Sequence, residues 1–164
     1  MSYATFAQGP GGVEISRDAK NDQIVWRGDF NFQDLNNEKT FDWFRDGVKS
    51  YKPDKSAVKT LKEKLSKYKL VIAIGTWCSD SHDMIPGLYA VLQQCNFPIA
   101  NVYMFGVNRD KESLNAESKL YHIKNAPTVI VYKDNMEIGR VVETAHESIE
   151  ADLAEIINKD KPAR

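Results

Sequence analysis

One of the two cysteines in this sequence occupies a position where sulfur chemistry is favoured. Cys78 follows the continuous apolar run of residues 70–74 and then Gly75. A run that is apolar on both faces predicts a buried central strand. After the cysteine, apolar residues recur every three or four positions, which predicts a helix. A thiol at this junction meets unpaired backbone N–H groups and the positive end of the helix dipole, so we expect Cys78 to ionise readily and act as a nucleophile.

Three segments, in the right order, resemble the thioredoxin family. Residues 77–81, Trp-Cys-Ser-Asp-Ser, are similar to the active-site motif Trp-Cys-x-x-Cys with a serine in place of the second cysteine. Pro86 stands eight residues after Cys78, where thioredoxins carry the proline that kinks the active-site helix. Residues 121–128, Tyr-His-Ile-Lys-Asn-Ala-Pro-Thr, resemble the family segment Tyr-x-Ile-Arg-x-x-Pro-Thr. The resemblance implies that Pro127 follows a cis peptide bond and faces the cysteine.

The resemblance covers roughly residues 54–158 and implies an α/β thioredoxin fold, with a central mixed sheet flanked by helices. The apolar pattern predicts a matching order of strand, helix, strand, helix, hairpin and helix. After the active-site helix, the predicted elements are a strand at 99–107, a helix at 111–121, a hairpin of 128–133 with 137–143, and a last helix after a capping box at 144–147. We therefore assign residues 54–160 to a thioredoxin-like domain.

The residues before this domain carry no motif of their own. Residues 1–22 are rich in glycine and polar side chains and show no sustained period, which predicts a flexible lead-in. Residues 23–53 predict an extension packed on the domain, made of one strand at 23–27 and one helix within 32–51. Gly47 and Pro53 are expected to limit that helix.

The serine in the motif changes the chemistry that the resemblance implies. In thioredoxins the second cysteine resolves the mixed disulfide, but the hydroxyl of Ser81 can only donate a hydrogen bond to the thiolate of Cys78. The family also has a buried acid six residues before the active cysteine, where this chain has Ile72. Both differences predict a one-cysteine mechanism, in which an external thiol such as glutathione serves as co-substrate and releases the adduct.

Side chains near Cys78 are expected to shape its groove and its charge. The predicted substrate-binding residues are Trp77, Ser79, Asp80, Ala126 and Pro127; for Trp77 the alternative is a lid packed beside the site. The resemblance implies that the backbone next to the proline pairs with an extended substrate. His82, one helical turn after the cysteine, is a candidate modulator that would favour the thiolate if charged. Asp80 and Asp83 would oppose it.

The second cysteine, Cys95, is predicted to pack in the core and to take no part in thiol chemistry. Cys95 continues the apolar stripe of the helix, so we expect a buried thiol. The two cysteines lie 17 residues apart on one helix, roughly 25 Å at the rise of an α-helix, which is beyond the reach of a disulfide. A metal site built on Cys78 and His82 would need further ligands that the spacing does not supply, so no metal is predicted.

The composition of the chain limits the classes of partner that it is expected to bind. The 164 residues hold 22 basic and 23 acidic side chains, so the chain has no overall field to attract nucleic acid. No apolar run is long enough to span a bilayer, and the first residues do not resemble a signal peptide. With two unpaired thiols, these features predict a cytoplasmic protein that binds neither nucleic acid nor membrane. The sequence makes no prediction about oligomeric state.

The function predicted from the sequence is thiol exchange or deglutathionylation on protein or small-molecule thiols and disulfides, through Cys78 alone. Two alternatives stay open. One is a non-catalytic module that keeps the groove for binding peptides. The other is iron-sulfur binding assisted by glutathione, although the motif at 77–81 does not match that of monothiol glutaredoxins.

Overall fold

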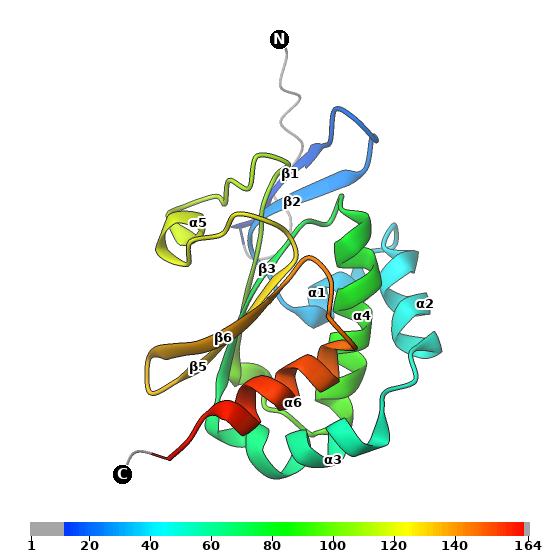
Figure 1. The fold of residues 1–164 in the computed structure, drawn as a ribbon. Coiled ribbons are helices and arrows are strands. Elements are labelled where there is room, and N and C mark those ends of the chain that lie inside the picture. The colour runs from blue at the N-terminus through cyan, green and yellow to red at the C-terminus, as the bar shows by residue number, and fades with distance from the viewer. Residues whose placement is uncertain (1–11, 163–164) are drawn as a thin grey trace.

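The computed structural model describes residues 12–162, and its centre is a six-stranded mixed sheet (Figure 1). The strands lie side by side in the order β1-β2-β4-β3-β5-β6. Their bounds are β1 Glu14–Arg17, β2 Ile24–Asp29, β3 Lys69–Ile74, β4 Val102–Gly106, β5 Thr128–Lys133 and β6 Met136–Val142. Strand β3 pairs in parallel with β4 and antiparallel with β5, so the buried strand that precedes the cysteine lies inside the sheet.

Most of the helices cover one face of this sheet (Figure 1). Their bounds are α1 Phe32–Asn37, α2 Asp42–Ser50, α3 Lys55–Lys64, α4 Ser79–Gln94, α5 Glu117–Leu120 and α6 Ile149–Lys159. One apolar cluster joins α1, α2, α3, α4 and α6 to the sheet, through side chains such as Phe44, Leu88 and Leu153. A second, smaller cluster, around Val71 and Phe105, fills the other face under the segment that contains α5.

The predicted fold class is confirmed. Strand, helix, parallel strand, short helix, hairpin and helix follow one another from β3 to α6, in the order that the sequence predicts. The hairpin of β5 and β6 turns at Asp134 and Asn135, both of which have positive φ angles of 50° and 63°. Such angles are those of a tight hairpin turn, which explains why these two residue types predict it correctly.

The first part of the chain differs from the prediction of a flexible lead-in. Residues 1–11 lie outside the described part, but Glu14–Arg17 form the edge strand β1, antiparallel to β2. A strand of four residues is too short to produce a sustained period, so the pattern at 1–22 gave no sign of it. Strand β2 in turn pairs with β4, through Gly28 and Gly106, so the N-terminal residues belong to the same sheet.

The single helix expected within 32–51 is two helices. Asn31 caps α1, and its side chain and that of Asp34 accept each other's backbone N–H groups. Gly47 does not end α2 but lies inside it, where α2 packs against the middle of α4. A Cβ at position 47 would lie 2.6 Å from the Cβ of Pro86, so only glycine allows this close approach.

Three other predicted boundaries shift. The strand expected at 99–107 begins with a 3-10 turn, Ile99–Asn101, and the helix expected at 111–121 shrinks to α5. Side chains hold the residues before α5 in a loop, since the hydroxyls of Ser113 and Ser118 each accept the other residue's backbone N–H at 3.0 Å. The last helix begins after Ser148, whose hydroxyl accepts the N–H of Ala151 at 3.1 Å, and not at the capping box expected at 144–147.

Candidate thiol site

The loop between β3 and α4 holds Cys78 at the first turn of the helix. The N–H of Cys78 donates to the carbonyl of Gly75 at 2.9 Å, which closes a tight turn. The residue itself is extended and serves as the N-cap of α4, and its carbonyl accepts the N–H of His82 at 3.1 Å. A Cβ at Gly75 would lie 2.9 Å from the ring of Trp77, so the turn requires glycine at this position. The sequence thus places a sulfur at a helix N-terminus, as predicted.

The sulfur faces the loop that precedes β5. The Sγ atom of Cys78 lies 3.5 Å from the carbonyl oxygen of Ala126, and the peptide bond between Ala126 and Pro127 is cis. Cys78 is partly exposed, whereas Ala126 and Pro127 are buried. A partly exposed thiol beside a backbone carbonyl leaves room for an external sulfur to approach while one side of the residue stays covered. The structure therefore brings Cys78 beside the segment of Ala126 and Pro127, although Ala126 lies 48 positions later in the sequence.

Ser81 lies beneath this loop and not at its surface. Its side chain is fully buried, and its hydroxyl oxygen accepts the N–H of Gly75 at 3.1 Å. Within residues 12–162, no hydrogen bond joins Ser81 to Cys78. In this structure the serine therefore fixes the turn that presents the cysteine.

The ring of His82 is held away from solvent by its neighbours. It stacks on Trp43 with 4.1 Å between ring centroids, and its Nε2 atom donates to the carbonyl oxygen of Thr76 at 2.7 Å. Burial lowers the pKa of His82, although the bond to Thr76 and the charge of Asp83 oppose that shift. A lowered pKa favours the neutral ring at neutral pH. The charged form that would assist Cys78 is therefore disfavoured.

The other predicted groove residues differ in exposure. Trp77 is only 5% exposed, and its Nε1 atom donates to the carbonyl of Val107 at 2.8 Å, so most of its ring packs inside the protein. Ser79 is exposed, and Asp80 is half-buried. Asp80 also borders a small hollow of about 200 Å³, together with Asp83 and residues 143–145 and 147–149. Ser79 and Asp80 are thus the predicted contacts that a substrate could reach most easily.

Residues from two further segments complete the site, and the sequence did not predict them. One segment is the hairpin of β1 and β2, called the N-terminal hairpin below, and the other follows β4. Asn21 donates its side-chain amide to the carbonyl of Trp77 at 3.0 Å. Arg109 binds Asp18 with two hydrogen bonds, 2.8 Å from Nε to Oδ2 and 2.6 Å from Nη2 to Oδ1. Its guanidinium lies 4.6 Å from the centroid of the Trp77 ring. The hydrogen bonds to Arg109 hold the pKa of Asp18 below its usual value, so this carboxylate stays ionised.

One feature of the sequence could have indicated Arg109. It follows β4 by a few residues, as Cys78 follows β3, and these neighbouring strands are parallel. The carboxyl ends of parallel neighbours meet at the same edge of a sheet, where binding sites form in α/β proteins.

No family model matches this chain, and no curated protein matches its sequence. Among solved structures it is similar to an HIV epitope scaffold, with a TM-score of 0.51 and 17% identity over 72% of this chain and 82% of that one. It is also similar to a protein of unknown function from Pseudomonas aeruginosa, with a TM-score of 0.45 and 18% identity over 70% and 75% of the two chains. A thioredoxin from Fasciola hepatica matches with a TM-score of 0.40 and 24% identity over 63% and 89%. At these identities the likeness concerns the fold alone.

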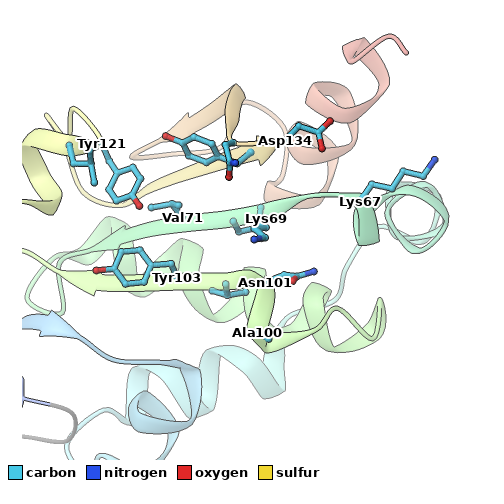
Figure 2. A pocket seen from close by; sticks show the side chains of 13 residues that line it. Lys67, Lys69, Val71, Ala100, Asn101, Tyr103, Tyr121 and Asp134 are labelled. Atoms are coloured by element: carbon cyan, nitrogen blue, oxygen red, sulfur yellow. The ribbon is translucent and has the colours of Figure 1, made fainter. Parts of the chain in front are cut away.

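A larger hollow lies elsewhere, on the face of the sheet opposite most of the helices (Figure 2). It has a volume of about 760 Å³, and Lys69, Tyr103 and Tyr121 are among the side chains that line it. None of the predicted site residues lines it.

Residues 12–162 contain neither a candidate metal-binding cluster nor a helix that could span a membrane. No group of three or more histidine, cysteine or acidic side chains there is placed to hold a metal ion. No helix in the same range is both long and apolar enough to cross a bilayer.

Proposed function

We propose that this protein is a thioredoxin-like redox protein that uses Cys78 as a single nucleophilic thiol. The observation that supports this most strongly is the position of its sulfur, partly exposed at the N-cap of α4 and 3.5 Å from the carbonyl of Ala126. Unpaired N–H groups and the helix dipole at that end favour a negative charge on sulfur. Cys78 is therefore the group in the site that is best placed to attack a disulfide.

The reaction is a thiol exchange in two steps. The thiolate of Cys78 attacks one sulfur of an external disulfide, the new S–S bond forms, and the other sulfur leaves as a thiolate with the electron pair. An external thiolate such as glutathione then attacks the substrate sulfur of the mixed disulfide, forms a new disulfide with it and expels the thiolate of Cys78 with its electron pair. The overall reaction exchanges one external thiol for another in a disulfide, so it needs no further oxidant or reductant. Ser81 takes no part in the second step, because its hydroxyl is not a nucleophile toward sulfur.

The exposed residues at the start of α4 form the rest of the proposed substrate groove. Ser79 and Asp80 lie at the surface beside the cysteine, and the backbone around Ala126 borders it on the other side. An extended segment of a protein substrate could pair with that backbone, as peptides do when they bind along an exposed main chain. The proposed substrates are accordingly glutathionylated or disulfide-bonded proteins and small disulfides.

The proposal places the protein in a reducing compartment such as the cytoplasm. Its two cysteines are both free and stand at opposite ends of α4, so they cannot form a disulfide with each other. A reducing glutathione pool would also supply the external thiol that the second step needs.

The test is adduct formation with oxidised glutathione, followed by peptide mass spectrometry. We expect a glutathione adduct on Cys78 that reduced glutathione removes, and the same adduct in a Cys95→Ser variant. A protein that forms no adduct on Cys78, although the residue is alkylated by a neutral reagent, would overturn the redox proposal. That outcome would favour the non-catalytic binding module.

A further inference from the structure

Two cationic side chains lie beside Trp77, the residue directly before the proposed nucleophile. The guanidinium of Arg109 is centred 4.6 Å from the Trp77 ring, and the Nζ atom of Lys111 lies 6.0 Å from the same ring. Lys111 also donates to the carbonyl of Arg109 at 2.7 Å, so the two residues are held as a unit. Cations over a tryptophan face are attracted by the ring quadrupole, which fixes them at this edge of the site.

The Arg109 side chain is held in place by Asp18 and remains partly exposed to solvent. Asp18 binds its Nε and Nη2 atoms from the N-terminal hairpin, and the side chain of Asp18 is only 4% exposed. The Arg109 side chain is 34% exposed, and within residues 12–162 its Nη1 atom makes no hydrogen bond. The hydrogen bond to Asp18 is the main cause that raises the pKa of Arg109. The ring of Trp77 adjoins the cysteine, because a Cβ at Gly75 would lie 2.9 Å from that ring and 3.1 Å from the Cβ of Cys78.

Carboxylates gather at the small hollow next to the first turn of α4. Asp80, Asp83, Glu143 and Glu147 border this hollow of about 200 Å³. The Trp77 side carries the cations of Arg109 and Lys111 together with the carboxylates of Asp18 and Asp110, whereas the charged residues around the hollow are all acidic. A substrate sulfur that carries a nearby carboxylate would be attracted on the first side and repelled on the second.

We propose that Arg109, assisted by Lys111, forms an anion subsite beside Cys78 that favours substrates with a carboxylate close to the reacting sulfur. This inference rests on the proposed function, because it names the substrate class of the same thiol. Glutathione conjugates and disulfides next to acidic side chains belong to that class. Asp18 is a positioning residue in this subsite, since it acts through Arg109.

The test compares two alkylating reagents that differ in charge and share a leaving group, iodoacetate and iodoacetamide. Both are applied to the full chain with Cys95→Ser, and the ratio of their rates at Cys78 is measured. Arg109→Gln should lower the ratio of the iodoacetate rate to the iodoacetamide rate about two- to five-fold, the size of a partly exposed ion pair. The control Lys55→Gln removes one positive charge from the start of α3, which lies far from the site in Figure 1, and should leave the ratio unchanged.

A further variant separates charge from structure. Arg109→Lys keeps the charge and should retain most of the ratio. Added salt should reduce all these differences, because it screens exposed charges. An equal ratio in Arg109→Gln and Lys55→Gln would overturn the inference, as would a ratio in Arg109→Lys that falls as far as in Arg109→Gln. Because alkylation requires no disulfide exchange, this failure is distinct from a failure to form the glutathione adduct.

Discussion

The two cysteines of this protein lie at the two ends of one helix. Cys78 is the N-cap of α4, and Cys95 is its C-cap. At the first end the helix dipole is positive and favours a negative sulfur, whereas at the second it is negative. Burial raises the pKa of the Cys95 thiol, with the charge of Lys62 opposing this, and its Sγ donates to the carbonyl of Val58 at 3.9 Å. Cys95 is partly exposed and not buried as predicted, and it packs against the core. Position in the fold, and not residue type, therefore distinguishes the proposed nucleophile from this thiol.

The two ends of α4 also differ in which parts of the chain surround them. Segments distant in the sequence meet around Cys78, since the N-terminal hairpin, the end of β4 and the loop before β5 all contact residues 77–78. At the other end, the Sγ atom of Cys95 donates to the carbonyl of Val58 on α3. The proposed reactive end is thus surrounded by three distant segments of the chain, whereas Cys95 contacts a neighbouring helix.

Removing each thiol in turn should produce the largest difference. Cys78→Ser is expected to abolish the glutathione adduct completely, because a hydroxyl cannot replace the attacking thiolate. Cys95→Ser should leave the amount of adduct unchanged, as intact-mass measurement after exposure to oxidised glutathione would show. An adduct that persists in Cys78→Ser would place the reactive sulfur at the wrong end of the helix.

Restoring the second cysteine of the motif should sharpen the contrast. In Ser81→Cys the new thiol lies one turn from Cys78 and can attack the mixed disulfide within the chain, so the adduct should discharge at least about ten-fold faster without external thiol. The decay is followed by mass spectrometry, with an internal disulfide between positions 78 and 81 as product. Ser81→Ala, the matched control, should keep its adduct. An adduct of equal lifetime in both variants would contradict the proposed one-cysteine mechanism.

A change in α2, where this helix packs against the middle of α4, should reduce stability without altering the difference between the two ends of α4. Gly47→Ala places a methyl group against Pro86 and should lower the free energy of unfolding by about 1–3 kcal/mol, the usual effect of overpacking. Asp46→Ala, on the exposed side of the same helix, is the control and should have little effect in denaturant titrations. Equal stabilities for the two variants would show that α2 and α4 do not approach as closely as described.

The smallest expected effect concerns His82. Its pKa is lowered in the folded protein relative to the unfolded value of 6.5, so the unfolded chain binds more protons in that range. The stability contributed by the neutral ring is fully present above about pH 6.5 and is lost as the pH falls through the folded pKa. His82→Gln should remove this part of the pH dependence in urea titrations. An unchanged profile would mean that His82 titrates normally.

The sequence predicts the elements that depend on local interactions better than the features that depend on contacts between distant residues. The apolar run before Gly75 and the turn at Asp134 and Asn135 are local signals, and both predicted the elements that the structure shows. The sequence did not indicate β1, because a short edge strand is defined by its partner and not by its own period. The pair of Asp18 with Arg109 spans 91 residues, and no spacing rule connects positions so far apart.

The most direct measurement follows the alkylation of Cys78 and Cys95 in the same wild-type sample as the pH is raised. Peptide mass spectrometry gives the rate at each cysteine separately with iodoacetamide, a neutral reagent. Cys78 is expected to be labelled faster at neutral pH and to reach half its maximal rate at a lower pH than Cys95. Faster labelling of Cys95, or identical profiles for the two thiols, would contradict this expectation.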